Sequence, residues 1–278
     1  MTYKQALTRA QQLLKRAKIE NPELEALVLL CASIQKSKEY VYTWPEKKLS
    51  LKQANLFWQF IAKRCQGVPT AYLTQEKEFY GLKFKVNPHT LIPRPETEII
   101  IEHVQKLFAP KDKFIFCDLG TGSGCLGITL AKIFPKSKGI LVDLSQKALS
   151  LAQENAVFHR VNKRLLLVQA NLVKVAFSRP LQLMVANPPY IAQKDMANLS
   201  PEVKQEPARA LDGGKTGLKY YPHLARLARQ FLAPDGFLLV EFGFNQTKAI
   251  QTIFKTFNLK IIPDLAGKDR VGVITKST

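Results

Sequence analysis

The segment Asp118-Leu119-Gly120-Thr121-Gly122-Ser123-Gly124 gives the strongest indication of the fold. An apolar run precedes it and a helical pattern follows it, so we expect a strand over 114–118 and a helix over 124–134. Glycines let the backbone turn sharply beside a ligand, and the start of a helix offers N–H groups without helical partners. The stretch therefore predicts a strand, a ligand-binding loop and a helix. Gly122, Gly124 and Gly127 also match the dinucleotide pattern G-x-G-x-x-G, so the loop alone leaves the ligand open.

Strands and helices alternate along the chain on the C-terminal side of this loop. Further strands are expected at 139–143, 165–170, 181–186 and 236–242, and further helices at 145–157, 219–232 and 245–257. This alternation predicts an α/β fold with a doubly wound, mostly parallel sheet. The last two apolar runs, 259–265 and 270–275, are expected to form a strand pair at one edge of the sheet.

The N-terminal part has a different pattern and predicts a small helical bundle. Thr2 and Ser50 each begin a capping box, and Asn21 before Pro22 predicts an N-cap followed by a proline at the first helical position. Neither strand-like alternation nor a glycine loop interrupts this part of the sequence. We therefore expect a helical domain over 1–75, a hairpin and proline-rich connector over 76–95, and an α/β domain over 96–278.

The charge of the chain is strongly positive. Its 278 residues include 41 Lys and Arg against 22 Asp and Glu, a net charge of +19. Residues 1–75 carry +7 of this excess and the rest carries +12, so the charge is spread and does not form a tail. Such a charge favours an acidic partner, either a nucleic acid or an acidic protein. It also predicts weak, non-specific binding to nucleic acid.

Other features of the composition argue against metal and membrane sites. The 4 cysteines have no C-x-x-C spacing and the 4 histidines are scattered, so we expect reduced thiols and no bound metal. The longest apolar run, 26–34, is much shorter than the roughly 18 residues that a membrane span needs. Basic residues interrupt the first 20 positions, which is unlike a secretory signal. We expect a cytoplasmic protein without a membrane segment.

Asp143 closes the strand expected at 139–143 and lies 25 residues after Asp118. In nucleotide-binding α/β sheets, an acidic side chain at this place holds ribose hydroxyls. Both NAD and S-adenosylmethionine carry a ribose, so Asp143 predicts a ribose site without choosing between the two.

Asn187-Pro188-Pro189-Tyr190 follows the apolar strand expected at 181–186 and is the most informative motif. The prolines stiffen the backbone at the carboxyl end of the strand, where open α/β sheets bind ligands. The side-chain carbonyl of Asn187 and the backbone carbonyl of Pro188 are two acceptors for the hydrogens of an amino group. The ring of Tyr190 is expected to cover the planar group that carries this nitrogen. A dinucleotide oxidoreductase would leave the motif unexplained.

The glycine loop, Asp143 and Asn187–Tyr190 together resemble the S-adenosylmethionine-dependent methyltransferases that modify amino nitrogens. Over essentially its full length the chain is similar to the PrmC/HemK family, which methylates the glutamine of the Gly-Gly-Gln motif in peptide chain release factors. This resemblance extends to the helical N-terminal region and to the segments 92–98, 206–214 and 266–271. The tetrapeptide is shared with DNA-adenine and RNA-guanine methyltransferases and so indicates only the reaction type. The longer segments indicate the subfamily.

The resemblance implies a seven-stranded methyltransferase sheet with S-adenosylmethionine as cofactor. It further implies that Asp143 binds the ribose and that Asn187 lies between cofactor and substrate. At the adenine the family usually has an acidic residue and often an aromatic one, whereas this chain has Asn171 and Leu172. An amide oxygen still accepts from an adenine amino group and a leucine still packs on its ring, so we expect altered affinity and retained activity. The methionine part is assigned to the loop residues Gly120, Thr121, Gly122, Ser123 and Gly124.

The resemblance also implies the reaction and its protein substrate. Catalysis is assigned to Asn187, Pro188 and Tyr190, and binding of the glutamine amide to these three together with Pro189. The expected activity is methyl transfer to the side-chain nitrogen N5 of glutamine, with the helical domain docking the release factor. Two alternatives stay open: an amino-group methyltransferase acting on DNA adenine or RNA guanine, and a non-enzymatic reader that keeps the fold.

Overall fold

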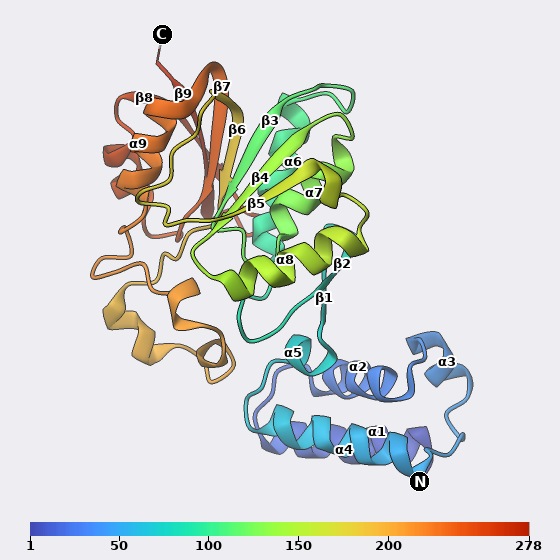
Figure 1. Cartoon of the computed structure of the whole chain (residues 1–278). Coiled ribbons are helices and arrows are strands. Elements are labelled where there is room, and N and C mark those ends of the chain that lie inside the picture. Colours follow the sequence, from blue (N-terminus) through green and yellow to red (C-terminus); the bar gives the residue numbers. More distant parts are fainter. Residues whose placement is uncertain (278) are drawn as a thin grey trace. The chain divides into compact units, whose positions relative to one another are not determined.

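The computed structural model describes residues 1–277, and these form two compact units (Figure 1). The helical unit consists of Met1–Glu76 together with Ser200–Gln205. The sheet unit consists of Lys77–Leu199 and the chain from Glu206 onward. Nothing in the sequence of the short segment 200–205 indicates that it packs with residues from the beginning of the chain.

The helical unit has the two capping boxes that the sequence predicts, at Thr2 and Ser50. Asn21 occupies the N-cap position of the second helix, but its backbone is left-handed with a φ of 50° and its side chain caps nothing. The apolar faces of the helices form one core, which includes Leu14, Leu30 and Phe57. Its helices are α1 (Tyr3–Arg16), α2 (Pro22–Ile34), α3 (Lys38–Thr43), α4 (Leu51–Cys65) and α5 (Thr70–Thr74), with the 3₁₀ turn η4 (Val203–Gln205).

A buried arginine links the segment 200–205 to the helices of this unit. The side chain of Arg64 is almost fully buried and donates to Glu25 at 3.0 Å and to Glu202 at 2.8 Å. A buried guanidinium needs such partners, because removing its charge from water without them is costly.

Among the residues described, the main sheet of the sheet unit has seven strands in the order β5-β4-β3-β6-β7-β9-β8. The first five in this order run parallel, and β9 is antiparallel to both of its neighbours. The predicted α/β fold with a mostly parallel sheet and a terminal strand pair is therefore confirmed. The strands are β3 (Ile115–Leu119), β4 (Lys138–Asp143), β5 (Leu165–Gln169), β6 (Leu181–Ala186), β7 (Leu232–Glu241), β8 (Phe257–Pro263) and β9 (Asp269–Lys276).

Helices cover both faces of this sheet, each over its own apolar core. Side chains alternate along a strand, so Phe116 belongs to one core and its neighbour Cys117 to the other. The first core takes residues from α6 (Glu98–Leu107), α7 (Cys125–Ile133) and α8 (Gln146–Phe158), and the second from α9 (Tyr221–Phe231) and α10 (Thr247–Ile253).

The last predicted helix is too long at both ends. We expected 245–257, whereas α10 spans Thr247–Ile253. Phe257 instead pairs with Lys276 as the first residue of β8, because its side chain enters the second core from the sheet. The short 3₁₀ turns of this unit are η1 (Pro95–Thr97), η2 (Asn162–Arg164), η3 (Gln193–Asn198) and η5 (Ala208–Ala210).

A separate hairpin, expected from the sequence within 76–95, is formed by β1 (Glu76–Phe79) and β2 (Leu82–Lys85). The fully buried side chain of Asn155 on α8 joins this hairpin to the glycine loop. Its Oδ1 accepts from the backbone N–H of Lys85 at 2.8 Å, and its Nδ2 donates to the carbonyls of Lys85 at 3.0 Å and Ser123 at 2.8 Å. One side chain thereby fixes the back of the loop that faces the cavity described below.

Replacing Asn155 with alanine is expected to lower the free energy of unfolding by about 2–4 kcal/mol, because three backbone groups, one of them in a fully buried hydrogen bond, lose their partner. Asn258→Ala is the matched control, since this exposed asparagine makes one long side-chain hydrogen bond and should change stability by less than about 0.5 kcal/mol. Urea unfolding monitored by circular dichroism measures both. Equal midpoints for the two variants would contradict the role of Asn155.

Candidate active site

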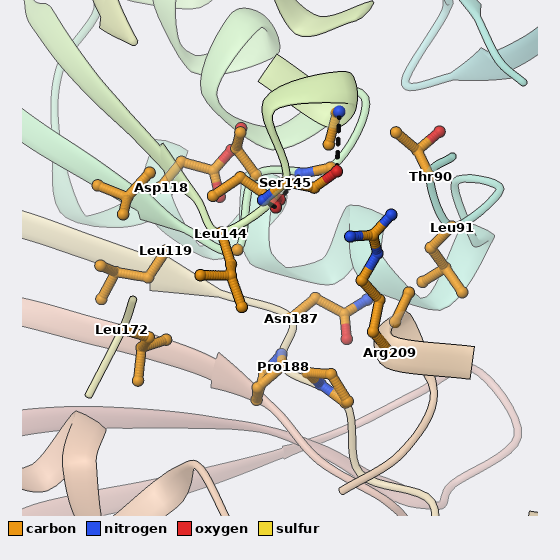
Figure 2. Close-up of a pocket in the computed structure, with 18 of the residues that line it drawn as sticks. Thr90, Leu91, Asp118, Leu119, Leu144, Ser145, Leu172, Asn187, Pro188 and Arg209 are labelled. Carbon is orange, nitrogen blue, oxygen red and sulfur yellow. Dashed lines mark hydrogen bonds between the residues drawn. The ribbon is translucent and has the colours of Figure 1, made fainter. Parts of the chain in front are cut away.

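A cavity lies at the carboxyl ends of β3, β4, β5 and β6 (Figure 2). Its wall is built from the segments that follow these strands and from residues 89–97, with Arg209 and Lys219 also contributing. Parallel strands bring their carboxyl ends to one edge of a sheet, which is why segments far apart in sequence meet here. The sequence-predicted site residues that line the cavity are Gly120, Thr121, Gly122, Ser123, Asp143, Asn171, Leu172, Asn187, Pro188 and Pro189.

The glycines of the loop have two different roles. Gly120, Gly122 and Gly124 have φ values of 80°, 55° and 84°, a left-handed region that favours glycine. A Cβ atom at Gly120 or Gly122 would meet nothing within 4 Å, so these two leave open space on the side of the cavity. A Cβ atom at Gly124 would lie 2.7 Å from Cδ1 of Ile128 and 3.2 Å from Cβ of Ala152. Gly124 therefore lies behind the wall and lets the loop pack against α8.

The buried carboxylate of Asp118 holds the loop from below. Its Oδ2 accepts from the hydroxyl of Thr121 at 2.6 Å and from the backbone N–H of Gly127 at 3.0 Å. Burial raises its pKa to about 6, although these two hydrogen bonds act in the opposite direction. Asp118 thus organises the turn from β3 into α7.

Asp143 stands at the end of β4, where the sequence predicts a ribose site. Its Oδ2 accepts from the backbone N–H of Gly122 at 2.9 Å and its Oδ1 from that of Ser145 at 2.8 Å. A carboxylate oxygen accepts more than one hydrogen bond, so both oxygens keep capacity for ligand hydroxyls. The side chain is thereby fixed in direction and still able to bind.

The wall after β5 combines one polar and one apolar side chain. Oδ1 of Asn171 accepts from the backbone N–H of Val173 at 2.9 Å, which stabilises the turn. Leu172 packs against the second core and lines the cavity together with the exposed side chain of Leu144. Apolar surface of this kind suits the face of a flat aromatic ring.

Asn187 is held by a hydrogen bond to a threonine from another segment. Its Nδ2 donates to Oγ1 of Thr97 at 2.9 Å, and the hydroxyl of Thr97 donates to Oε2 of Glu241 at 2.6 Å. Because the hydroxyl hydrogen is used toward the carboxylate, Thr97 can only accept from Asn187. The side-chain carbonyl of Asn187 is therefore directed away from Thr97 and remains an acceptor at the cavity wall.

Tyr190 differs from the expectation drawn from the sequence. We expected its ring to cover a bound planar group, but Tyr190 is not among the residues that line the cavity. Its ring packs against the second core, and its hydroxyl donates to Oε1 of Glu241 at 3.4 Å. The physical reason is that the buried carboxylate of Glu241 provides a partner for the phenol within the protein, which turns the ring inward.

Sequence reasoning missed Thr97, Glu241 and Arg209. Thr97 lies within the segment 92–98 and Arg209 within the segment 206–214. Both segments carry the family resemblance, but the sequence assigns neither residue a role. Glu241 ends the β7 strand beside the strand that leads to Asn187. An acidic side chain closing an apolar strand was the available signal, since the same signal pointed to Asp143.

Glu206 fixes the position of residues 89–97, which form one side of the cavity. This buried carboxylate forms an ion pair with Arg94 and accepts from the backbone N–H of Ile92 at 2.9 Å. The connection links the segments 92–98 and 206–214, which are far apart in the sequence.

The chemistry available at this wall is binding and orientation. Burial raises the pKa of the Cys125 thiol to about 12, so it carries no nucleophilic thiolate at neutral pH. Across residues 1–277 no group of three or more His, Cys, Asp or Glu is placed to hold a metal ion. The groups that the wall offers for binding and orientation are a glycine cradle, a fixed carboxylate and an oriented amide carbonyl.

Among residues 1–277, no helix combines the length and the apolar character that a membrane span requires.

The residues that line the cavity match the chemical groups of S-adenosylmethionine. The open space at Gly120 and Gly122 is a cradle that any side chain would narrow. Asp143 supplies acceptors for two hydroxyls, and Leu144 with Leu172 supplies an apolar surface for a base. Asn187 lines the same cavity as the cradle.

Comparison with known proteins gives two family matches and full-length relatives. A model described as the PrmC N-terminal domain matches residues 5–74, and one described as the methyltransferase small domain matches 95–224. A protein from Koribacter versatilis called release factor glutamine methyltransferase is 37% identical over 100% of both chains. A protein of the same description from Moorella thermoacetica is 37% identical over 97% of both chains. A solved methyltransferase from Pyrococcus furiosus is similar with a TM-score of 0.52 and 20% identity, covering 71% of this chain and 90% of that one, which supports the fold alone.

Gly124→Ala is expected to weaken binding of S-adenosylhomocysteine at least tenfold. The backbone at this position is left-handed, which is unfavourable for alanine, and the added Cβ would be crowded by Ile128 and Ala152. Gly267→Ala is the matched control: its φ is 76°, but nothing lies within 4 Å of the added Cβ. It should lose about 1 kcal/mol of stability and keep its affinity. Calorimetric titration of both variants decides the matter, and unchanged binding by Gly124→Ala would refute the packing role.

Proposed function

The chain belongs to the family of release factor glutamine methyltransferases, and from this premise we propose that it methylates N5 of the glutamine in the Gly-Gly-Gln motif of peptide chain release factors. It is an enzyme that uses S-adenosylmethionine. The observation that carries the proposal is the orientation of Asn187, whose side-chain carbonyl is the acceptor that an amide NH₂ group needs. The substrate assignment implies action in the cytoplasm, where release factors work on ribosomes.

The first task of the site is to prepare a weak nucleophile. The nitrogen of an amide is planar and poorly reactive because its lone pair is delocalised into the carbonyl. We assign the two N–H groups of the substrate amide to the side-chain carbonyl of Asn187 and the backbone carbonyl of Pro188. Acceptors placed in this way favour a pyramidal nitrogen and direct its lone pair toward the methyl donor. Their attraction increases as positive charge develops on the nitrogen.

S-adenosylmethionine supplies, when bound, a sulfonium methyl group that is already activated for displacement. Gly120–Gly124 are assigned to its methionine part, Asp143 to its ribose, and Asn171 with Leu172 to its adenine. In the reaction a C–N bond forms and a C–S bond breaks, and one proton of the substrate nitrogen leaves to water. Pro189 is assigned to the rigid corner that holds Pro188, and Tyr190 to support of that corner from the core.

The decisive experiment is methylation of unmethylated release factor by the pure protein with S-adenosylmethionine, followed by mass spectrometry of the Gly-Gly-Gln peptide. We expect a gain of one methyl group on the glutamine. Asn187→Ala should lower kcat about a thousandfold or more, because the amide loses an acceptor in the transition state, while the Kd of S-adenosylhomocysteine stays within about threefold. Asn198→Ala is the matched control, since this asparagine is exposed and lies outside the cavity wall.

Two outcomes would redirect the assignment. Near-wild-type turnover by Asn187→Ala would remove the role given to this residue. An unmodified glutamine together with demonstrated cofactor binding would favour the alternative acceptor, an amino group of DNA adenine or RNA guanine, which the net charge of +19 also suits. Failure to bind the cofactor at all would leave a non-enzymatic reader.

The helical unit is proposed to dock the release factor. Basic and aromatic side chains surround α3: Nζ of Lys47 lies 4.8 Å from the ring centroid of Tyr40 and 4.9 Å from that of Trp44. Tyr42 is 68% exposed and Trp44 is 45% exposed. Exposed aromatics are effective anchors in protein interfaces, and the lysines add attraction for an acidic partner.

Lys36, Lys38 and Lys48 are exposed and lie just before α3, at its first position and next to Lys47. Replacing them with alanine should raise KM for intact release factor about tenfold, with an effect that shrinks at high salt. Activity on a short glutamine peptide should not change, because such a peptide lacks the acidic release-factor surface that these lysines are proposed to attract. The matched control replaces Lys15, Arg16 and Lys18, which removes the same charge from the end of α1 and its following turn. Steady-state kinetics with both substrates measures the effect. Equal losses in the two triple variants would mean that only overall charge matters.

A further inference from the structure

We propose that Thr97 and Glu241 are positioning residues for methyl transfer, with Glu241 acting through the Thr97 hydroxyl to orient and polarise the side-chain amide of Asn187. The inference rests on the proposed function, because it takes Asn187 as the group that holds the substrate nitrogen. It adds two residues that act through Asn187 and determine which end of its amide the substrate meets.

The orientation follows from the direction of the hydrogen bonds. The two ends of an asparagine amide have nearly the same shape, so the surroundings decide which end points where. The hydroxyl of Thr97 has a single hydrogen, and a carboxylate can only accept it, so Oγ1 of Thr97 faces Asn187 as an acceptor. A flipped amide would bring two oxygens together with no hydrogen between them. The charge on Glu241 therefore excludes the orientation in which Asn187 would present NH₂ to a substrate NH₂.

Burial makes this arrangement stiff and strongly polarised. Thr97 is 2% exposed and Glu241 is 1% exposed, so water does not compete for their hydrogen bonds. The 2.6 Å contact is in the range of a charge-assisted O–H···O⁻ bond. In a chain of hydrogen bonds each one polarises the next, so the carboxylate increases the negative charge on the outer oxygen of Asn187. That oxygen then interacts more strongly with a nitrogen that becomes positive during methyl transfer.

The surroundings of Glu241 make the arrangement sensitive to pH. Burial raises the pKa of Glu241 to about 7, while the hydrogen bond from Thr97 and the charge of Arg270 act to lower it. Burial also raises the pKa values of the Tyr190 and Tyr221 phenols and of the Cys125 thiol, which keeps them neutral. The groups that face Glu241 from the elements around it are Arg270 on β9, Glu96 and Thr97 on η1, Tyr190 after β6, Tyr221 on α9 and Cys125 on α7.

The sign of the pH effect follows directly. Above about pH 7 the carboxylate is ionised, accepts from Thr97 and fixes the amide. Below that pH it becomes protonated and can itself donate to Oγ1 of Thr97, so the Thr97 hydrogen is no longer held in one direction. The wild-type enzyme is therefore expected to gain kcat as the pH rises through about 7, with the Kd of S-adenosylhomocysteine unchanged.

The test compares three variants on the Gly-Gly-Gln peptide over pH 5.5–9. Glu241→Gln keeps an acceptor for Thr97 but removes the charge, and should lower kcat about 10- to 100-fold at pH 8 and abolish the rise near pH 7. Thr97→Val keeps the shape of the side chain but removes the hydroxyl, and should lower kcat by a similar factor. Thr97→Ser keeps the hydroxyl and should restore most of the activity that Thr97→Val loses. Each should bind S-adenosylhomocysteine within about threefold of wild type.

Each other result counts against the proposal. A pH profile of Glu241→Gln that still rises near 7 would assign the titration elsewhere, for example to Asp118, and overturn the role of Glu241. Loss of cofactor affinity in parallel with kcat would mean that the contacts are merely structural. Should Glu241→Gln fail to fold, the comparison of Thr97→Val with Thr97→Ser decides, and equal activity of these two refutes the relay. Inactive wild-type enzyme with bound cofactor rejects the proposed function itself, which is a different result from an active wild type with unaffected variants.

Discussion

The buried carboxylate of Asp118 is the constraint on which the rest of the site depends. It lies at the last position but one of β3 and accepts hydrogen bonds from the hydroxyl of Thr121 in the loop and from the backbone N–H of Gly127 in the first turn of α7. These two hydrogen bonds add to those by which the backbone N–H groups of Gly120 and Thr121 donate to the carbonyl of Val142, and together they fix a loop with three left-handed glycines. Asn155 fixes the same loop from the other side through the carbonyl of Ser123. The cradle is thus shaped by Asp118, which itself lines the cavity, and by Asn155, which does not.

Holding the carboxylate of Asp118 in the interior destabilises the fold near neutral pH. Burial raises the pKa of Asp118 from 3.8 in water to about 6, which corresponds to about 3 kcal/mol of stability lost at neutral pH. The loss is absent below about pH 4, where the group is protonated in both states, and complete above about pH 6. Glu241 is raised in the same direction, to about 7. Asp118 beside the glycine loop and Glu241 behind Asn187 therefore lower the stability of the fold, while their hydrogen bonds fix the groups that are assigned to ligand binding.

Sequence patterns located the elements of the sheet well because strand and helix periods are local properties. The strand expected at 181–186 is found at Leu181–Ala186, and the helix expected at 124–134 at Cys125–Ile133. Errors fall where tertiary packing overrides local preference. The helix expected at 245–257 stops at Ile253 because Phe257 belongs to an edge strand. Asn21 is found at its predicted N-cap position but makes no cap hydrogen bond, because its backbone is left-handed.

Short segments of the sequence were enough to predict the fold class and the family resemblance, and they pointed to part of the cavity wall, since glycine spacing, strand-end acids and the tetrapeptide 187–190 are all local patterns. Only the tertiary structure decided that Tyr190 turns into the core and that Thr97 and Glu241 stand behind Asn187. The tertiary structure alone also shows that residues 200–205 belong to one compact unit with residues 1–76. The physical reason is that the direction of a hydrogen bond depends on which groups meet in space. Thr97, Asn187 and Glu241 are brought together by the sheet, and no local pattern records that meeting.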